Sequence, residues 1–204
     1  MDAGTRRSAA KRHQIVHAAR RAFLANGFAA TSMDAVVAEA GVSKQTLYRY
    51  FSSKTDLLAA VLTSEVALTG IFTEPPPVGS SAELRAQLVG LARAVTHELL
   101  TPSRIALMRL LFGEAFRIPE LRDTLRDALP AQFIGVVEAI LASATAAGLI
   151  HVDRPELVSR MFVGSIFSFI ALDGFLRVDP LPPPPIGDIE HLVDAFLRAV
   201  EVQR

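Results

Sequence analysis

Apolar residues recur every three or four positions along most of the chain, which is the period of a helix buried on one side. The first such segment predicts a helix over about 9–25, ended by Asn26-Gly27. A short helix follows, which begins in the capping sequence Thr31-Ser32-Met33-Asp34 and ends at Gly41. Ser43 then caps a third, equally short helix. Two short helices around a turn with glycine, braced by a preceding helix, predict a helix-turn-helix arrangement.

The helical period continues to the end of the chain. Ser53-Lys54-Thr55-Asp56 repeats the capping pattern and opens a longer helix through about Phe72. The prolines and glycine of 74–81 forbid a continuous helix there and predict a boundary between two modules. Further helices are predicted over about 82–100, 103–116, 119–147 with a break or kink at Pro130, 155–176 and 187–201. The sequence therefore predicts an all-α fold, with a three-helix head and a larger helical body.

Composition narrows the class of protein. The chain has 204 residues, of which 50% are hydrophobic and 21% charged, so it is long and apolar enough to fold. Its longest runs without charge, 139–150 and 161–172, each hold 12 residues, whereas a bilayer span takes about 20. We therefore expect no membrane helix, and the start of the sequence lacks the apolar region of a secretory signal, which predicts a cytoplasmic protein. The absence of cysteine excludes disulfides and thiolate chemistry.

The net charge of zero hides a separation of charge along the chain. Residues 1–56 hold nine Lys or Arg against four Asp or Glu, a net charge of +5, which leaves 12 against 17, or −5, for residues 57–204. A basic module joined to an acidic one is typical of a polyanion-binding head on a body with another task. Chance clustering of charge is the alternative.

The third predicted helix carries chemistry on one face. At about 100° per residue, Leu47, Tyr50 and Phe51 share the packed side, and the opposite side is polar. That polar side holds Lys44, Gln45, Tyr48 and Arg49, with Thr46 at its flank. Such groups can pair with phosphates and with the edges of bases in the major groove of DNA. An ordinary solvated face would have a similar composition.

The residues from Ile15 to Leu62 resemble the DNA-binding head of the TetR family of bacterial transcriptional regulators, above all in GVSKQTLYRYFSSKTDLL. The resemblance implies that Thr31 and Lys54 contact phosphates, that Ser43 to Arg49 enter the major groove, and that Tyr48 and Tyr50 anchor the backbone. Residues 1–56 would be the DNA-binding domain, linked by a fourth helix over 54–72 to an effector-binding and dimerisation domain over 57–204. The stretches LMRLLFGEAFRIPELRDTL and AAGLIHVDRPELVSRMF are similar to the body of an AcrR-like subgroup.

Four basic residues, Arg6, Arg7, Lys11 and Arg12, precede and enter the first predicted helix. They can form an arm that extends into a minor groove, or a disordered charged terminus.

One head reads little DNA, so a homodimer on a palindromic operator is expected, with recognition helices about 34 to 36 Å apart. A stripe of low relief in 155–176 and an apolar face of the last helix resemble the four-helix seam of the family. The predicted interface residues are Leu157, Met161, Gly164, Ser165, Ser168, Ala171, Leu192, Val193, Phe196 and Val200. Alternatively, these helices complete the core of one protomer.

The body also offers aromatic side chains for a small, mostly apolar effector. The candidate pocket residues are Met108, Phe112, Phe116, Phe133, Phe162, Phe167 and Phe169. Phe and Met at helical spacing are equally the residues of a plain core, so both interpretations stand.

The function implied is a transcriptional repressor that an effector releases from DNA. No catalytic motif, no cofactor-binding motif and no His spacing for a metal appears, so we expect neither an enzyme nor a metal or cofactor site. A helical small-molecule carrier or scaffold without DNA function is the alternative.

Overall fold

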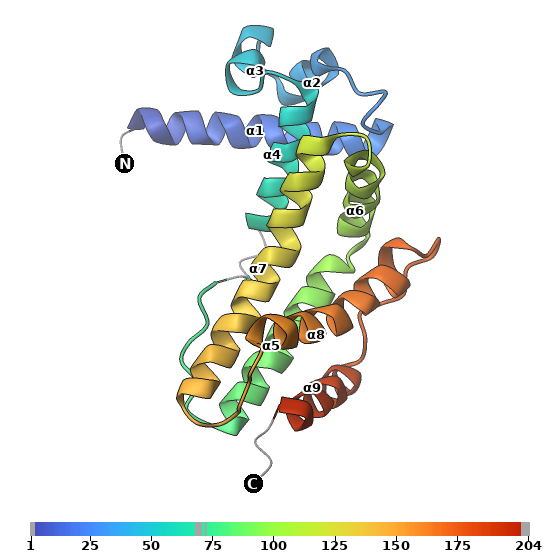
Figure 1. The fold of residues 1–204 in the computed structure, drawn as a ribbon. Helices are drawn as coiled ribbons and strands as arrows, with labels where there is room; N and C mark the ends of the chain where they lie inside the picture. The colour runs from blue at the N-terminus through green and yellow to red at the C-terminus, as the bar shows by residue number, and fades with distance from the viewer. Residues whose placement is uncertain (1–2, 68–70, 72, 201–204) are drawn as a thin grey trace. The chain divides into compact units, whose positions relative to one another are not determined.

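A computed structural model describes residues 3–67, 71 and 73–200, and these residues form helices joined by turns, with no strand among them (Figure 1). The prediction of an all-α fold is confirmed. The chain divides into two compact units, each built from two parts of the sequence. The first takes 1–68 and 106–128, and the second takes 69–105 and 129–204.

The first unit holds α1 (Ala3–Asn26), α2 (Met33–Ala40), α3 (Lys44–Tyr50) and α4 (Lys54–Ala67). The larger part of α6 (Pro102–Ala115) and the start of α7 (Pro119–Ala146) also belong to it. α1 packs against α2 and α4. The fully buried side chains of these helices come from positions of helical period, as the sequence predicts, and include Ile15, Phe23, Val36, Leu57 and Leu58, and α3 adds Leu47.

The fourth helix was predicted to reach Phe72, and α4 ends at Ala67. Residues 68–70 and 72 lie outside the described part of the chain, and Ile71 is not helical.

The second unit is built from α5 (Ser81–Leu99), the rest of α7, α8 (Pro155–Ser168), a π-helix, η1 (Phe169–Phe175), and α9 (Ile186–Val200). α5 packs against α9, and α8 continues directly into η1. One apolar cluster joins these helices, and the rings of Phe133, Phe162 and Phe196 meet in it. The second unit is therefore helical and has its own core, but its bounds differ from the predicted body of 57–204, because 57–68 and 106–128 belong to the first unit.

Two details of the second unit differ from the sequence prediction. α7 is one helix from Pro119 to Ala146, so the predicted alternative of a break at Pro130 is wrong, and that of a kink stays a prediction. The predicted single helix over 155–176 changes to a π-helix at Phe169. The wider turn ends where Gly174 lies against Leu100, since a Cβ on Gly174 would come within 2.7 Å of Leu100 Cδ2.

Two described helical segments, Pro119–Ala146 and Pro155–Phe175, are long and apolar enough to cross a membrane by length and composition alone. The sequence prediction of no membrane helix counted only runs without charge, and this broader criterion admits up to two charged residues. Core helices of a soluble protein pass the same criterion, so two such segments are weak grounds for a membrane span.

Candidate nucleic-acid interface

Side-chain caps fix the two short helices of the head. The Ser32 hydroxyl accepts a hydrogen bond from the Ala35 N–H at 3.0 Å and so begins α2. Gly41 ends α2 in the left-handed conformation, at a φ of 60° that favours glycine. Two residues later the Ser43 hydroxyl accepts from the Thr46 N–H at 3.1 Å and begins α3. The predicted helix-turn-helix is thus present, and its local cause is the predicted set of caps.

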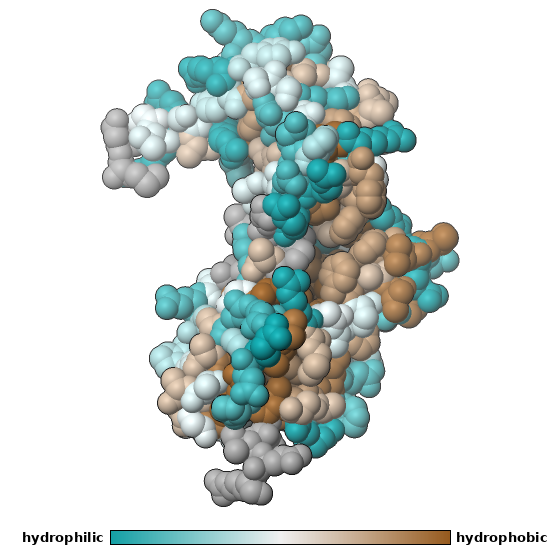
Figure 2. Space-filling view, viewed as in Figure 1, coloured by the Kyte–Doolittle hydropathy of each residue, from teal (hydrophilic) through white to brown (hydrophobic). Residues whose placement is uncertain are grey.

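The packing of α3 leaves its polar side uncovered. Leu47 and Phe51 are buried in the head. Tyr50 is half-buried, which places its ring at the edge of the packed side. The side chains on the opposite side, Lys44, Gln45, Tyr48 and Arg49, are exposed, and Thr46 is half-buried. Figure 2 shows hydrophilic surface over α2 and α3 at the top of the view.

One carboxylate lies beside this face. The Lys44 ammonium is 2.8 Å from a carboxylate oxygen of Asp34, and this contact raises the pKa of Lys44, first through the hydrogen bond and then through the charge of Asp34. Both side chains are well exposed, so the pair is worth little to stability. Because a phosphate can compete with Asp34 for the ammonium, Lys44 stays available for DNA.

A hydrogen-bond network links the other end of α3 to α1. The hydroxyls of Tyr50 and Ser8 are 3.1 Å apart, and Arg49 Nη2 donates to the Tyr50 oxygen at 3.2 Å. The guanidinium of Arg49 also lies over the Tyr50 ring, 5.1 Å from its centroid. The Ser8 hydroxyl, and after it Arg49, lower the pKa of the Tyr50 phenol. The orientation of Arg49 is therefore set in part by a residue of α1.

This geometry can be compared with known proteins. Residues 15–61 match the sequence model of bacterial regulatory proteins of the tetR family, and residues 86–201 match that of the AefR-like transcriptional repressor, C-terminal domain. The chain belongs to the TetR family of transcriptional regulators. The resemblance found in the sequence is confirmed. Regulators of this family are soluble DNA-binding proteins and generally not enzymes.

Relatives with this fold cover most of the chain. It is similar to the uncharacterized HTH-type transcriptional regulator Mb1581 of Mycobacterium bovis, with 27% identity over 172 residues, or 83% of this chain and 77% of that protein. The solved structure of the flavonoid-responsive regulator FrrA is 30% identical, with a TM-score of 0.77 over 96% of this chain and 100% of FrrA. The HTH-type transcriptional activator FasR of Mycolicibacterium smegmatis is 45% identical over 56 residues, 28% of this chain and 26% of FasR.

Two residues that the TetR resemblance places on phosphates have other partners here. The Thr31 side chain is only 2% exposed, and its hydroxyl lies 2.7 Å from the Gly27 carbonyl and 3.1 Å from that of Ala22. The Lys54 ammonium donates to the carbonyls of Phe28, Ala29 and Thr31 at 2.7, 3.1 and 2.9 Å. Since an ammonium has three hydrogens, these bonds use them all. Both side chains hold the loop between α1 and α2 in the chain without DNA, and the phosphate roles implied for them by the resemblance stay predictions.

We expect Lys54→Met to lower the free energy of unfolding of the head by roughly 1.5 to 3 kcal/mol, because three carbonyls lose a charged donor. Chemical denaturation followed by circular dichroism measures this change. Lys44→Met is the matched control, with an expected loss below about 1 kcal/mol. A Lys54 variant as stable as the parent chain, but with a smaller salt dependence of DNA binding, would support the phosphate role.

The basic arm is part of α1. Arg6, Arg7, Lys11 and Arg12 lie on the helix, so the sequence-based alternatives of an extended arm or a disordered terminus are both corrected. Sequence reasoning missed these turns because residues 3–8 carry no apolar period. Contacts with the end of α3 hold them instead, by the Ser8–Tyr50 hydrogen bond and by Arg12, which lies over the Phe51 ring at 5.2 Å.

The predicted effector residues are divided between the two units. In the first unit Met108 is buried and Phe112 half-buried, whereas Phe116 is 88% exposed. In the second unit Phe133 and Phe162 are core residues. The remaining two residues of the prediction are half-buried Phe169 and exposed Phe167. That these seven residues line an effector pocket therefore stays a prediction.

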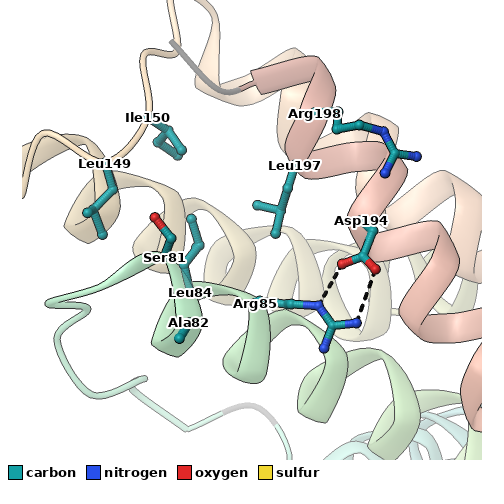
Figure 3. Close-up of a pocket in the computed structure, with 9 residues that line it drawn as sticks. All are labelled: Ser81, Ala82, Leu84, Arg85, Leu149, Ile150, Asp194, Leu197 and Arg198. Carbon is teal, nitrogen blue, oxygen red and sulfur yellow. Dashed lines mark hydrogen bonds and ion pairs between the residues drawn. The ribbon is translucent and has the colours of Figure 1, made fainter.

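A cleft that sequence reasoning missed lies within the second unit, between the start of α5 and the end of α9 (Figure 3). Its volume is about 340 Å³, and Leu84, Leu149, Ile150 and Leu197 give it apolar walls. On one side Arg85 makes two hydrogen bonds to Asp194, at 2.6 and 3.1 Å. This pair lowers the pKa of Asp194 and raises that of Arg85, in each case mainly through the hydrogen bond. The two residues are too far apart in sequence for their contact to be foreseen.

The predicted dimer stripe is exposed on α8 but not on α9. Leu157, Met161, Gly164 and Ser168 are exposed, and Ser165 and Ala171 half-buried. Of the four predicted interface residues on α9, Leu192 is half-buried, and Val193, Phe196 and Val200 belong to the protomer core. These three are corrected to core residues, since a side chain already buried in one protomer has little area left for a partner. Figure 2 shows further hydrophobic surface on the projection at the right, where η1 and the following loop expose Leu172, Leu176 and Val178.

Among the described residues no group of three His, Asp or Glu side chains lies close enough to hold a metal ion.

Proposed function

We propose that the chain is a cytoplasmic repressor that binds a palindromic operator as a homodimer and leaves it when a small, mostly apolar effector binds. The observation that carries the proposal is the exposed face of α3, where Lys44, Gln45, Tyr48 and Arg49 project from a helix fixed by the Ser43 cap. Such a helix fits the major groove, where amide and guanidinium groups pair with base edges and lysine and tyrosine reach phosphates.

We infer from the C-terminal half of the chain that the protein represses transcription rather than activates it. Residues 86–201 match the domain of an AefR-like repressor, and this match supports repression. FasR is named an activator, but its match covers only 56 residues. Transcription from a promoter that the protein binds, measured with and without the protein, separates the two modes.

The dimer is proposed to form through α8. Leu157 and Met161 offer apolar area, and Gly164 and Ser168 allow a second helix to come close. The revised interface is therefore the stripe Leu157, Met161, Gly164, Ser165, Ser168, Ala171 and Leu192.

The effector step is supported by the apolar second unit and by similarity to a regulator named for its response to flavonoids. A ligand that favours one packing of the body shifts the population of the dimer toward a spacing of heads that no longer fits successive grooves. Release from DNA on addition of an aromatic compound would support this step. DNA affinity unchanged by a compound that binds would contradict it.

The assigned face is tested by a gel shift on the DNA directly upstream of the protein's own gene. Arg49→Ala is expected to weaken binding about tenfold or more, because a guanidinium that pairs with guanine or phosphate is lost. Tyr48→Phe, which removes one hydroxyl, is expected to weaken it roughly threefold to tenfold. Arg93→Gln, an exposed arginine of α5, is the control and should bind like the parent chain.

Helicity measured by circular dichroism should be the same in all these variants, since the three side chains are exposed. Unchanged DNA binding by both head variants would contradict the assigned face. If the parent chain binds no duplex even at low salt, the carrier or scaffold interpretation replaces the regulator.

A further inference from the structure

The first three turns of α1 lie outside the core of the head. Between residues 4 and 14 every side chain is exposed except that of Lys11, which is half-buried, and the first fully buried residue is Ile15. At 1.5 Å per residue these turns extend for about 16 Å. In Figure 1 this part of α1, in dark blue, projects beyond α2, α3 and α4. A helix segment that buries no apolar side chain gains little stability from the core of its own chain.

One exposed face of residues 4–14 continues the face of α1 that is buried in the core further along the helix. Gly4, Ser8 and Arg12 follow one another at intervals of four, and Ile15 and Ala19 continue the same row into the core. On the row and beside it, Gly4, Thr5, Ser8, Ala9 and Arg12 line an open depression. Because these side chains are small or basic and none is apolar and large, the depression suits a polar, anionic partner better than a protein helix.

The charge of α1 favours the same kind of partner. The helix contains six Arg or Lys and no acidic residue. In its packed half Arg20 and Arg21 pair with Glu65 and Glu39. In the projecting half Lys11 donates to the Gln14 amide oxygen, and Arg12 lies over the Phe51 ring. These contacts orient Lys11 and Arg12, and among the described residues no ion pair with a carboxylate is found for either of them.

The depression is joined to the recognition helix. The Ser8 hydroxyl is 3.1 Å from that of Tyr50, whose oxygen accepts from Arg49 on the proposed DNA face. A duplex that sits on α3 would thus run its backbone past Tyr50 and onto the projecting turns of α1.

We propose that residues 4–12 of α1 form a second DNA-contact element, which binds phosphates of the backbone beside the site read by α3. Arg7, Lys11 and Arg12 supply the charge, and the small residues let the strand approach. Ser8 is a positioning residue, which fixes this element to Tyr50 and Arg49. The inference rests on the proposed function and concerns affinity rather than the choice of sequence.

The test measures DNA affinity of the full chain at several salt concentrations, on a duplex of about 30 base pairs selected with the parent protein from a random pool and on a scrambled duplex. Loss of one phosphate contact lowers the slope of log K against log salt by about 0.9, and affinity at about 0.1 M salt roughly fivefold to tenfold. Arg7→Gln should show this loss, and Arg7→Gln/Lys11→Gln about twice the change in slope. The control Arg93→Gln removes the same charge from α5 and should leave the slope unchanged.

Each variant should lose affinity by the same factor on the selected and on the scrambled duplex, because contacts with phosphates do not depend on the base sequence. A loss confined to the selected duplex would show base readout and overturn the proposal. Parent-like slope and affinity in Arg7→Gln/Lys11→Gln would overturn it as well, while the function of α3 would stand. If the parent chain binds neither duplex, the proposed function itself fails.

The role of Ser8 has a separate readout. Ser8→Ala should weaken binding severalfold and reduce the salt slope, whereas Ser8→Thr, which keeps the hydroxyl, should restore both. Ser103→Ala, which removes an exposed hydroxyl of α6, is the control and should bind like the parent chain. If Ser8→Ala changes neither affinity nor slope, Ser8 does not position this element.

Discussion

Replacing Phe162 with alanine is expected to lower the free energy of unfolding by roughly 3 to 5 kcal/mol. The side chain is fully buried, and its ring centroid lies 5.0 Å from that of Phe196 and 6.4 Å from that of Phe133. Removal of the ring therefore opens a cavity between α7, α8 and α9, which the surrounding helices can fill only in part. Urea denaturation followed by circular dichroism measures the loss.

Phe167→Ala is the control, on the same helix but 39% exposed, with an expected loss below about 1.5 kcal/mol. The comparison also decides whether the aromatic residues of the body are plain core residues or line an effector pocket. A Phe162 variant that keeps parent stability and loses only the response to an effector would show that the ring lines a pocket.

Met161→Glu is expected to convert the dimer to a monomer, with dimerisation weakened at least about a hundredfold. Met161 is 52% exposed on α8, so a charge there does not disturb the protomer. In a two-fold interface the substitution occurs twice and brings two like charges into an apolar contact, which costs several kcal/mol. Sedimentation velocity over a range of concentrations measures the change.

The matched control for Met161→Glu is Phe116→Glu, which puts the same charge on another exposed apolar position outside the stripe. It should stay dimeric. Because the two heads of the proposed dimer would bind an operator jointly, the monomer is also expected to lose most of its DNA affinity. A Met161 variant that remains a dimer would place the interface elsewhere.

The local structure of the head could be predicted from sequence because its signals are local. Ser32, Gly41 and Ser43 act on residues within one turn, so the limits of α2 and α3 follow from the capping pattern. The contacts of Lys54 could not be predicted in this way. Its three carbonyl partners lie at least 23 residues earlier in the chain, and only the packing of α4 beside α1 brings them together.

The same limit explains the differences in the body. An apolar row on α9 looks alike whether it meets a partner or its own chain, and the contact of α5 with α9 decides that Val193 and Phe196 are core. No sequence pattern marks the π-helix of 169–175. It ends where Gly174 lies close to Leu100, and these two residues are far apart in the sequence. The cleft beside Arg85 is likewise lined by residues that are far apart in the sequence and meet only in the folded chain.

The projecting turns of α1 have a consequence for how such a protein can change over generations. Since they contribute no residue to either core, a lysine or arginine can be gained or lost there without altering the two cores or the face of α3 that is proposed to read bases. Time spent sliding on chromosomal DNA depends on such backbone charge. Evolution can therefore tune the speed of the search for an operator separately from the identity of that operator.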